Sequence, residues 1–583
     1  MTNAVPVLDR LDLDPVVREA LEFRRAMFDW CLREARRASE RGAVEHALQW
    51  NVLAARLGCM DCAVLASAEL ESNVLGFASR LPVPAWRPTP GRPRRWLHVF
   101  SEAGPSAGHS AMAWRWMSLD PEPNRHSVVL LSQRTAVAEQ LIDLVARRDG
   151  EVIRMDPDAP ILARAERLRT YAWTEADIVI LHVHPWEVVP TLAFGIPGGP
   201  PVLLLNHSAH LFGVGSTIAD LMINTRQSAQ EDEWSSVYRG MGDRLVMLPL
   251  VLPAPAWRVR TPELRADARR RLDVPADAPV LVTIGNSYKY TPLPGRDFLQ
   301  VARTITSRRP NAYVLAAGVF EDARWQAARA STGGRIRAFG TQLDVTPFHA
   351  AADVYIEGFP MGSATALLEA AHHGLPCVLA PRSCPPPFGT DGAVYDEMGV
   401  DQPADVEEYI ARALVLIDDE GVRQRTGQSF ANAVESHHAG EAWLAKLDAL
   451  KRSIPDGHKV YPLDQPPPIQ WPFVAFWSAV TIQNRADALG IVYRAAARLG
   501  LKPRFDPPMR EAVRVAKRIR MLHPIQRWLI TCTDRVAAVV PIERSGRLYA
   551  LYDWLATVLR EDGKIVRFWR ALGRRGRGSG LDA

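Results

Sequence analysis

The chain has 583 residues and a mass of 64.7 kDa, which is too long for one hydrophobic core and predicts three or four domains. Hydrophobic residues make up 47% and charged residues 23%, which argues against a disordered chain and a polytopic membrane protein. The net charge of +5 hides an asymmetry, because residues 501–583 carry 18 Lys and Arg against 8 Asp and Glu, whereas the first 500 residues sum to −5. The six cysteines are scattered and no apolar signal core follows Met1, so we expect a cytoplasmic protein.

The first 81 residues predict an all-helical region. Asp14 is a typical N-cap and Pro15 suits the first helical position, and apolar residues then recur at helical spacing. Two more helices are predicted from Ala43 to Leu57 and from Ala63 to Leu81. Five prolines follow within twelve residues. Because proline fixes φ and removes a hydrogen-bond donor, residues 82–95 are expected to form a stiff linker at a domain boundary.

After the linker, short apolar runs alternate with longer helical stretches, which is typical of a parallel sheet covered by helices on both faces. One such domain is predicted at 96–252 and another at 253–454, so the expected fold class is α/β with two tandem Rossmann-like, doubly wound domains. Ligands of such sheets lie beyond the carboxyl ends of the strands, so functional residues are expected in the loops that follow them. The predicted strands are Trp96–Phe100, Ser127–Leu131, Asp177–Leu181 and Pro201–Leu205, then Val280–Ile284, Ala312–Ala316, Val354–Ile356 and Cys377–Leu379.

Residues 455–583 predict a basic, mainly helical extension. No charged residue falls between Pro466 and Asn484, but the unbroken apolar part is shorter than the ~20 residues that cross a bilayer, so no transmembrane helix is expected. An amphipathic helix with one basic face is predicted from Arg510 to Ile530. It could pack on its own protein, or 501–583 could attach the chain peripherally to an anionic surface such as the inner membrane. No nucleic-acid partner is expected.

The most informative segment is EGFPMGSATALLEAAHHGLPCVLAP, Glu357 to Pro381. A predicted strand ends at its start, and a loop of small residues from Gly362 to Thr365 leads into a helix. Because the first turn of a helix leaves backbone N–H groups unpaired and its dipole favours negative charge, this loop predicts phosphate binding. One turn later, Glu369 would face the same cleft, where a carboxylate can accept hydrogen bonds from a ribose diol.

Together with RAFG at Arg337–Gly340 and IGNSYKYTP at Ile284–Pro292, this segment resembles the nucleotide-sugar domain of the glycosyltransferases with the GT-B fold. LLEAAHHGLP is similar to the helix of retaining members whose glutamate binds the ribose. GFPMGSAT resembles the phosphate loop of the O-linked N-acetylglucosamine transferases and the bacterial cytoplasmic N-glycosyltransferases. The resemblance implies that six residues bind the donor: Ser287, Lys289, Gly362, Ser363, Thr365 and Glu369.

The spacing of two glutamates departs from the retaining members of that family. Glu357 and Glu369 are twelve positions apart, whereas the family places them eight apart, so Glu357 is expected to line the cleft and not to catalyse. Lys289 would neutralise the charge that builds on the departing nucleoside diphosphate, which a metal ion does in other folds. No cluster of metal ligands falls near these loops. The sequence therefore predicts a metal-independent transfer with a nucleotide sugar as co-substrate and no cofactor.

Four histidines are candidates in the first α/β domain. In SEAGPSAGHS, Ser101–Ser110, His109 would stand at the head of a helix, where inverting members of the resembled family place a base; the alternative role is a helix cap. His207 and His210 follow another strand and are expected to contact the donor phosphate or the acceptor. His184 follows a third strand and either lines the cleft or packs in the core.

The leading interpretation is a hexosyltransferase that holds a protein, glycan or lipid acceptor between the two domains. A nucleotide-sugar epimerase is one alternative, and it would release free sugar products without an acceptor. A non-catalytic scaffold with the same fold is the other, and it would act through partner contacts made by the helical N-terminal region and the basic extension.

Overall fold

The computed structural model describes residues 15–59, 62, 64–89, 94–104, 108–252, 261–382 and 401–467. The chain divides into two compact units. Helices α1 (Pro15–Glu40) and α2 (Val44–Gly58) belong to one unit, and the other described helices and the strands belong to the second. The predicted basic helix at 510–530, and with it the expected membrane contact of 501–583, lies outside the described residues.

The first unit is a helical hairpin. Helix α1 begins at Pro15 and α2 covers the predicted range from Ala43 to Leu57 within one residue at either end. Gly42 joins them with a φ of +72°, in the left-handed region that suits glycine. Trp30 and Trp50 meet edge to face with ring centroids 5.0 Å apart, which holds the two helices together.

The predicted helix from Ala63 to Leu81 is wrong in extent. The structure has a shorter helix, α3 (Ala68–Leu75), and one 3₁₀ turn, η2 (Ala78–Arg80). The physical reason is a cap: Ser67 has an extended backbone, and its Oγ accepts a hydrogen bond from the N–H of Leu70 at 3.3 Å, so α3 starts after it.

The first α/β domain contains a seven-stranded parallel sheet. Its strands are β1 (Arg95–Phe100), β2 (Arg125–Leu130), β3 (Val152–Arg154), β4 (Ile178–His182), β5 (Val202–Asn206), β6 (Leu221–Asn224) and β7 (Leu245–Met247). They lie in the order β3-β2-β1-β4-β5-β6-β7, which is the doubly wound order. Its helices are α4 (Gly108–Leu119), α5 (Glu139–Arg147), α6 (Ile161–Glu175), α7 (Val189–Ala193), α8 (Ala229–Glu233) and the π-helix η3 (Trp234–Tyr238).

The second α/β domain contains a five-stranded parallel sheet. Its strands are β8 (Val280–Ile284), β9 (Tyr313–Ala317), β10 (Ile336–Ala338), β11 (Val354–Ile356) and β12 (Cys377–Val378), in the order β10-β9-β8-β11-β12. Its helices are α9 (Pro262–Arg271), the 3₁₀ turn η5 (Ser287–Tyr290), α10 (Phe298–Arg308), α11 (Ala323–Ser331), α12 (Thr346–Ala351), α13 (Ala364–His372), α15 (Val406–Asp418) and α16 (Glu420–His438). Two Rossmann-like sheets in tandem confirm the predicted fold class.

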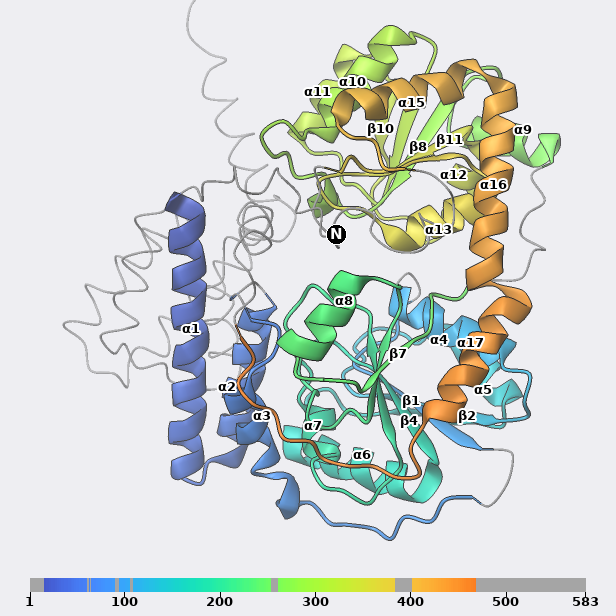
Figure 1. The fold of residues 1–583 in the computed structure, drawn as a ribbon. Coiled ribbons are helices and arrows are strands. Elements are labelled where there is room, and N and C mark those ends of the chain that lie inside the picture. Colours follow the sequence, from blue (N-terminus) through green and yellow to red (C-terminus); the bar gives the residue numbers. More distant parts are fainter. Residues whose placement is uncertain are drawn as a thin grey trace, which may run out of the picture. The chain divides into compact units, whose positions relative to one another are not determined.

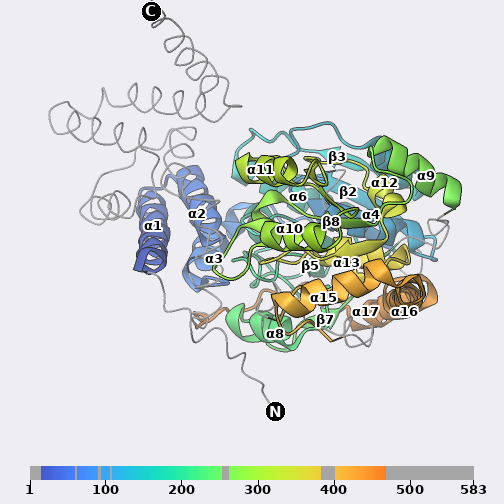
Figure 2. The ribbon, with the colours of Figure 1, turned by 90° about the horizontal axis from the view of Figure 1, so that it is seen from above.

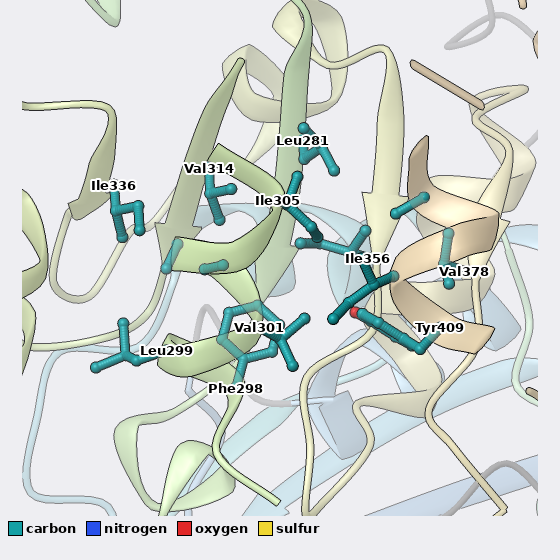
Figure 3. Packing of buried hydrophobic residues seen from close by; sticks show 14 of the residues in the cluster. Leu281, Phe298, Leu299, Val301, Ile305, Val314, Ile336, Ile356, Val378 and Tyr409 are labelled. Carbon is teal, nitrogen blue, oxygen red and sulfur yellow. The ribbon is translucent and has the colours of Figure 1, made fainter. Parts of the chain in front are cut away.

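Helices cover both faces of the second sheet (Figures 1 and 2). On one face, apolar residues of α10, α11 and α15 pack on the strands, and Figure 3 shows Phe298, Ile305 and Tyr409 around Ile356. On the other face, α9, α12, α13 and α16 provide the core. Because both faces are buried, the strands are runs of apolar residues without alternation.

The end of the described chain returns to the first domain (Figure 1). Helix α17 (Gly440–Ser453) places Trp443 in one core with Trp96 and Trp116. The segment 454–467 then runs along the same domain, where His458 Nδ1 lies 2.8 Å from Asp220 Oδ2 and both side chains are fully buried. Residues 440–467 thus complete the first domain, although the sequence placed them in the second domain and the extension.

Helix α3 also packs on the first domain. Glu71 is 1% exposed, and its carboxylate accepts hydrogen bonds from the backbone N–H groups of Gly215, Ser216 and Thr217 at 2.8 to 3.0 Å. These successive amides would otherwise be buried without partners. The described part of the chain contains no helix that is long and apolar enough to span a membrane.

Candidate functional site

The crevice of the second domain lies where the strand order reverses. Strands β8 and β11 are neighbours, but the chain leaves β8 toward β9 on one side and leaves β11 toward β12 on the other. The loops after β8 and β11 therefore diverge, and such a switch point is where open α/β sheets bind ligands. The two sequence segments that predicted donor binding, around Lys289 and Gly362, are these two loops.

Lys289 and Gly362 are in direct contact. The Nζ of Lys289, in η5, donates a hydrogen bond to the carbonyl O of Gly362 at 2.6 Å, and the backbone O of Lys289 accepts from the N–H of Met361 at 3.3 Å. An ammonium group has three protons, and this hydrogen bond uses one of them. A cation is thus fixed beside the small-residue loop that precedes α13.

Close packing fixes the two loops against each other. A Cβ on Gly285 would lie 2.8 Å from Ser363 Oγ, and one on Gly358 would lie 2.6 Å from the ring of Tyr290. The hydroxyl of Tyr290 in turn lies 2.8 Å from Thr283 Oγ1, so the ring is anchored on β8. A side chain at either position would therefore force the neighbouring side chain or loop to shift, and glycine lets the loops approach this closely.

Glu357 is a fully buried carboxylate at the base of the β11–α13 loop. Its Oε2 accepts a hydrogen bond from the N–H of Ala380 at 2.9 Å, and its backbone O accepts from the hydroxyl of Tyr409 at 2.9 Å. Among the described residues, no group forms a hydrogen bond of standard geometry with Oε1. The carboxylate therefore lies behind the loop and keeps acceptor capacity.

The charges of Glu357 and Lys289 depend on each other. Burial raises the pKa of the Glu357 carboxyl to about 7, while the N–H groups of Ala380 and Ser363 and the charges of Lys289 and Arg226 act to lower it. Burial lowers the pKa of Lys289 to about 8, while the charge of Glu357 acts to raise it. Both groups therefore titrate near neutral pH, as groups in functional crevices often do.

Helix α13 carries the remaining predicted donor residues. Ser363 is its N-cap, and its side chain forms no capping hydrogen bond to the helix. Thr365 is in the first turn, and Glu369 lies one turn later, on the same side of the helix. Glu369 Oε1 accepts a hydrogen bond from Arg115 Nη2 of α4 at 2.7 Å. The carboxylate predicted to bind ribose is thus already paired with the first domain.

Ser287 lies in the same loop as Lys289 but is engaged elsewhere. Its Oγ accepts a hydrogen bond from the backbone N–H of Phe320 at 2.9 Å, which ties the loop after β8 to the loop after β9. The structure thus brings Lys289, Gly362 and Ser363 together and places Thr365 on the adjoining helix. Ser287 contacts the neighbouring loop, and Glu369 contacts Arg115.

In the first domain, His109 belongs to the first turn of α4, at the carboxyl end of β1, and its side chain lies outside the described part. His184 and His207 line a hollow of about 380 Å³, counting the space open to solvent, together with Asn206 and Arg239. His210 is half-buried and is not among the residues that line it. Within the described ranges, no group of three or more His, Cys, Asp or Glu side chains could hold a metal ion.

A buried row of histidines crosses the first sheet, and it was not predicted from the sequence. His182 Nε2 lies 2.9 Å from His98 Nδ1, His98 Nε2 lies 3.0 Å from His126 Nδ1, and His126 Nε2 lies 3.1 Å from Asp120 Oδ2. Burial holds the pKa of His98 well below its usual value and also lowers that of His126. Because Asp120 only accepts, a neutral His126 donates to it from Nε2, and a neutral His98 then donates from its own Nε2 to His126 Nδ1. The pattern that could have predicted this row is one histidine in each of three apolar strands, β1, β2 and β4, which lie side by side in the sheet.

No protein-family model matches the sequence, and no curated protein matches it. The chain is similar to the solved structure of a glycosyltransferase from Rickettsia africae (13% identity, TM-score 0.49, covering 62% of this chain and 99% of that one). It is similar to Anabaena HepE, solved with UDP and glucose (13% identity, TM-score 0.46, covering 62% of this chain and 99% of that one). It is also similar to a mutant O-GlcNAc transferase of Thermobaculum terrenum (18% identity, TM-score 0.45, covering 77% of this chain and 86% of that one). These are likenesses of fold at low sequence identity.

Proposed function

We propose that this chain is a GT-B glycosyltransferase that transfers a sugar from a nucleotide-sugar donor to an acceptor without a metal ion. The observation that carries the proposal is the contact of the Lys289 ammonium with Gly362 O at the β8–β11 switch point. It places a cation beside a loop of small residues that opens a helix, an arrangement suited to a diphosphate. The sequence resemblance to glycosyltransferases of this fold supports the same reading.

In the proposed reaction, Lys289 donates hydrogen bonds to the donor diphosphate and stabilises the charge on the departing nucleoside diphosphate. The N–H groups at the start of α13, with Ser363 and Thr365, hold phosphate oxygens, and Glu369 accepts from the ribose. His109, at the head of α4, takes the proton of the acceptor group. Replacing His109 with alanine should lower turnover about 100-fold or more and leave donor affinity unchanged.

A panel of UDP-, GDP-, dTDP- and ADP-sugars tested by thermal shift is the direct test. A specific donor far above its dissociation constant should stabilise the fold by a few kcal/mol. Incubation of that donor with the protein alone then separates the classes. A free sugar isomer would indicate an epimerase, and binding without hydrolysis or transfer to any acceptor would indicate a scaffold. Full turnover in EDTA is the expected result for the metal-independent reaction.

The acceptor and the place of action are part of the same proposal. We expect a cytoplasmic enzyme whose basic segment 501–583 attaches to an anionic membrane surface, which favours a lipid-linked or cell-envelope acceptor. Flotation with vesicles of anionic lipid should recover the full chain and not a chain that ends at residue 500. If both chains fail to float, a protein or soluble glycan acceptor is favoured instead.

A further inference from the structure

We infer that Glu357 is a proton-exchanging member of the crevice: the fraction of it that is a carboxylate in the free protein takes up a proton when a diphosphate binds beside Lys289. The inference rests on the proposed function, since it assumes that the ligand of this crevice is a nucleotide sugar. It adds that donor binding is linked to proton uptake and that one named carboxyl group accounts for most of the uptake.

The position of Glu357 is the first support. The residue follows β11 directly, its side chain is 0% exposed, and the loop that it begins ends at Ser363 and α13. A buried negative charge behind a phosphate-binding loop would repel the ligand for which the loop is suited. The N–H groups of Ala380, which donates to Oε2, and of Ser363 compensate only part of that charge.

The charged neighbours are the second support. Lys289 of η5 and Arg226, which follows β6, stabilise the carboxylate. In the described part of the chain, Glu357 also raises the pKa of Tyr290, Tyr355 and Cys377, which are neutral at pH 7. The carboxylate form thus depends on the positive charge of Lys289. A bound diphosphate diester brings two negative charges to that lysine and offsets it.

The proton balance follows from these positions. Before binding, Glu357 is about half ionised at pH 7, because burial raises its pKa to about 7. A diphosphate diester does not titrate near neutral pH and only adds negative charge, so it raises the pKa of Glu357 further. The carboxylate then takes one proton from the acid form of the buffer, which becomes its conjugate base. Averaged over the population, each donor binds with uptake of about half a proton at pH 7.

Isothermal titration calorimetry measures the proton uptake on donor binding directly. The donor that gives the largest thermal shift in the panel is titrated into the full-length protein at pH 7, in PIPES and in imidazole, whose heats of ionisation differ. The difference in binding enthalpy should correspond to uptake of about 0.5 proton in the unmodified protein. At pH 5.5, measured in MES and in bis-tris, the difference in binding enthalpy should fall toward zero, because Glu357 is already protonated there. This pH series needs no variant.

Two variants test whether Glu357 is the residue that takes up the proton. Glu357→Gln keeps an acceptor for Ala380 and should lower the uptake at pH 7 to about 0.1 proton or less, the share left to Lys289 with its pKa of about 8. Glu407→Gln, an exposed carboxyl of α15 in the same domain, should behave like the unmodified protein. Donor binding with equal enthalpy in both buffers, or unchanged uptake in Glu357→Gln, overturns this inference and leaves the proposed function intact. Failure of every donor to bind overturns both.

Discussion

Arg115 Nη2 lies 2.7 Å from Glu369 Oε1, so α4 of the first domain is joined to α13 of the second by an ion pair. The same guanidinium donates through Nη1 to the backbone O of Val251 at 3.1 Å. Helix α4 carries His109 in its first turn, and α13 carries Thr365. The ion pair therefore links α4, whose His109 is expected to deprotonate the acceptor, to α13, which is expected to hold the donor.

The Arg115–Glu369 pair should contribute measurably to stability. Both side chains are about one-fifth exposed, so the pair is shielded from water better than a surface pair. A double-mutant cycle with Arg115→Ala and Glu369→Ala should give a coupling of about 1 kcal/mol in urea unfolding, smaller in high salt. The exposed pair Arg134–Asp158 is the control and should give no measurable coupling. Equal values for the two pairs would contradict the role of Arg115.

Lys289→Met should weaken binding of the nucleotide sugar. The variant keeps most of the side-chain volume but removes the cation beside Gly362. Hydrogen bonds to a charged group contribute about 1.5–3 kcal/mol, so the dissociation constant should rise roughly 10- to 100-fold, measured by calorimetry. Lys459→Met, an exposed lysine of the returning segment, is the control and should bind as tightly as the unmodified protein. Unaltered affinity in Lys289→Met would remove the donor from this crevice.

Glu71→Ala should strongly destabilise the first domain. The substitution leaves the buried N–H groups of Gly215, Ser216 and Thr217 without their acceptor. Because each unsatisfied buried donor costs about 1–3 kcal/mol, the free energy of unfolding should fall by at least about 3 kcal/mol in urea titrations. Ser72→Ala, at an exposed position of the same helix, should change it little. A small effect of Glu71→Ala would mean that these amides find other partners.

Acid should destabilise the fold through His438. Burial lowers its pKa to about 4, whereas an imidazole in the unfolded chain has a pKa near 6.5. Below pH 6.5 the unfolded state therefore binds a proton that the folded state does not, so the stability present above pH 6.5 is lost as pH falls toward 4.

A comparison of the unmodified protein with His438→Gln isolates the contribution of His438 to the pH dependence of stability. The comparison is needed because the raised pKa of Glu357 makes the folded state more stable, not less, as the pH falls over part of the same range. Glutamine can still donate to the O of Leu250, as Nδ1 of His438 does at 2.7 Å. In urea unfolding between pH 6 and 4.5, the unmodified protein should lose up to about 1.4 kcal/mol per pH unit more than the variant. Equal pH slopes would show that His438 is not buried as a neutral ring.

The eight strands predicted from apolar runs are present, each within two residues of its expected bounds. The four that were missed have three or four residues, and β3, β7 and β10 are edge strands with partly exposed side chains. Edge strands need no long apolar run, so their sequences resemble loops. Burial on both faces is what made the central strands predictable.

The sequence also predicted which loops of the second domain meet, because they follow strands that a doubly wound sheet places side by side. It could not predict the partners of the side chains in those loops. The ion pair of Glu369 joins residues 254 positions apart, and the burial of Glu357 depends on Ala380 and Tyr409. Such contacts arise from the packing of separate elements and leave no local pattern.

The return of α17 has a consequence for synthesis. Trp443, Leu447 and Leu450 fill the core that also contains Trp96 and Trp116, and Lys451 Nζ reaches Asp120 at 2.9 Å. A nascent chain that has emerged from the ribosome only as far as α16 has every strand of the first sheet but not the helix that covers part of one face. The first domain, whose strands are synthesised first, is thus completed last. The whole second domain must emerge before α17 can complete the core of the first.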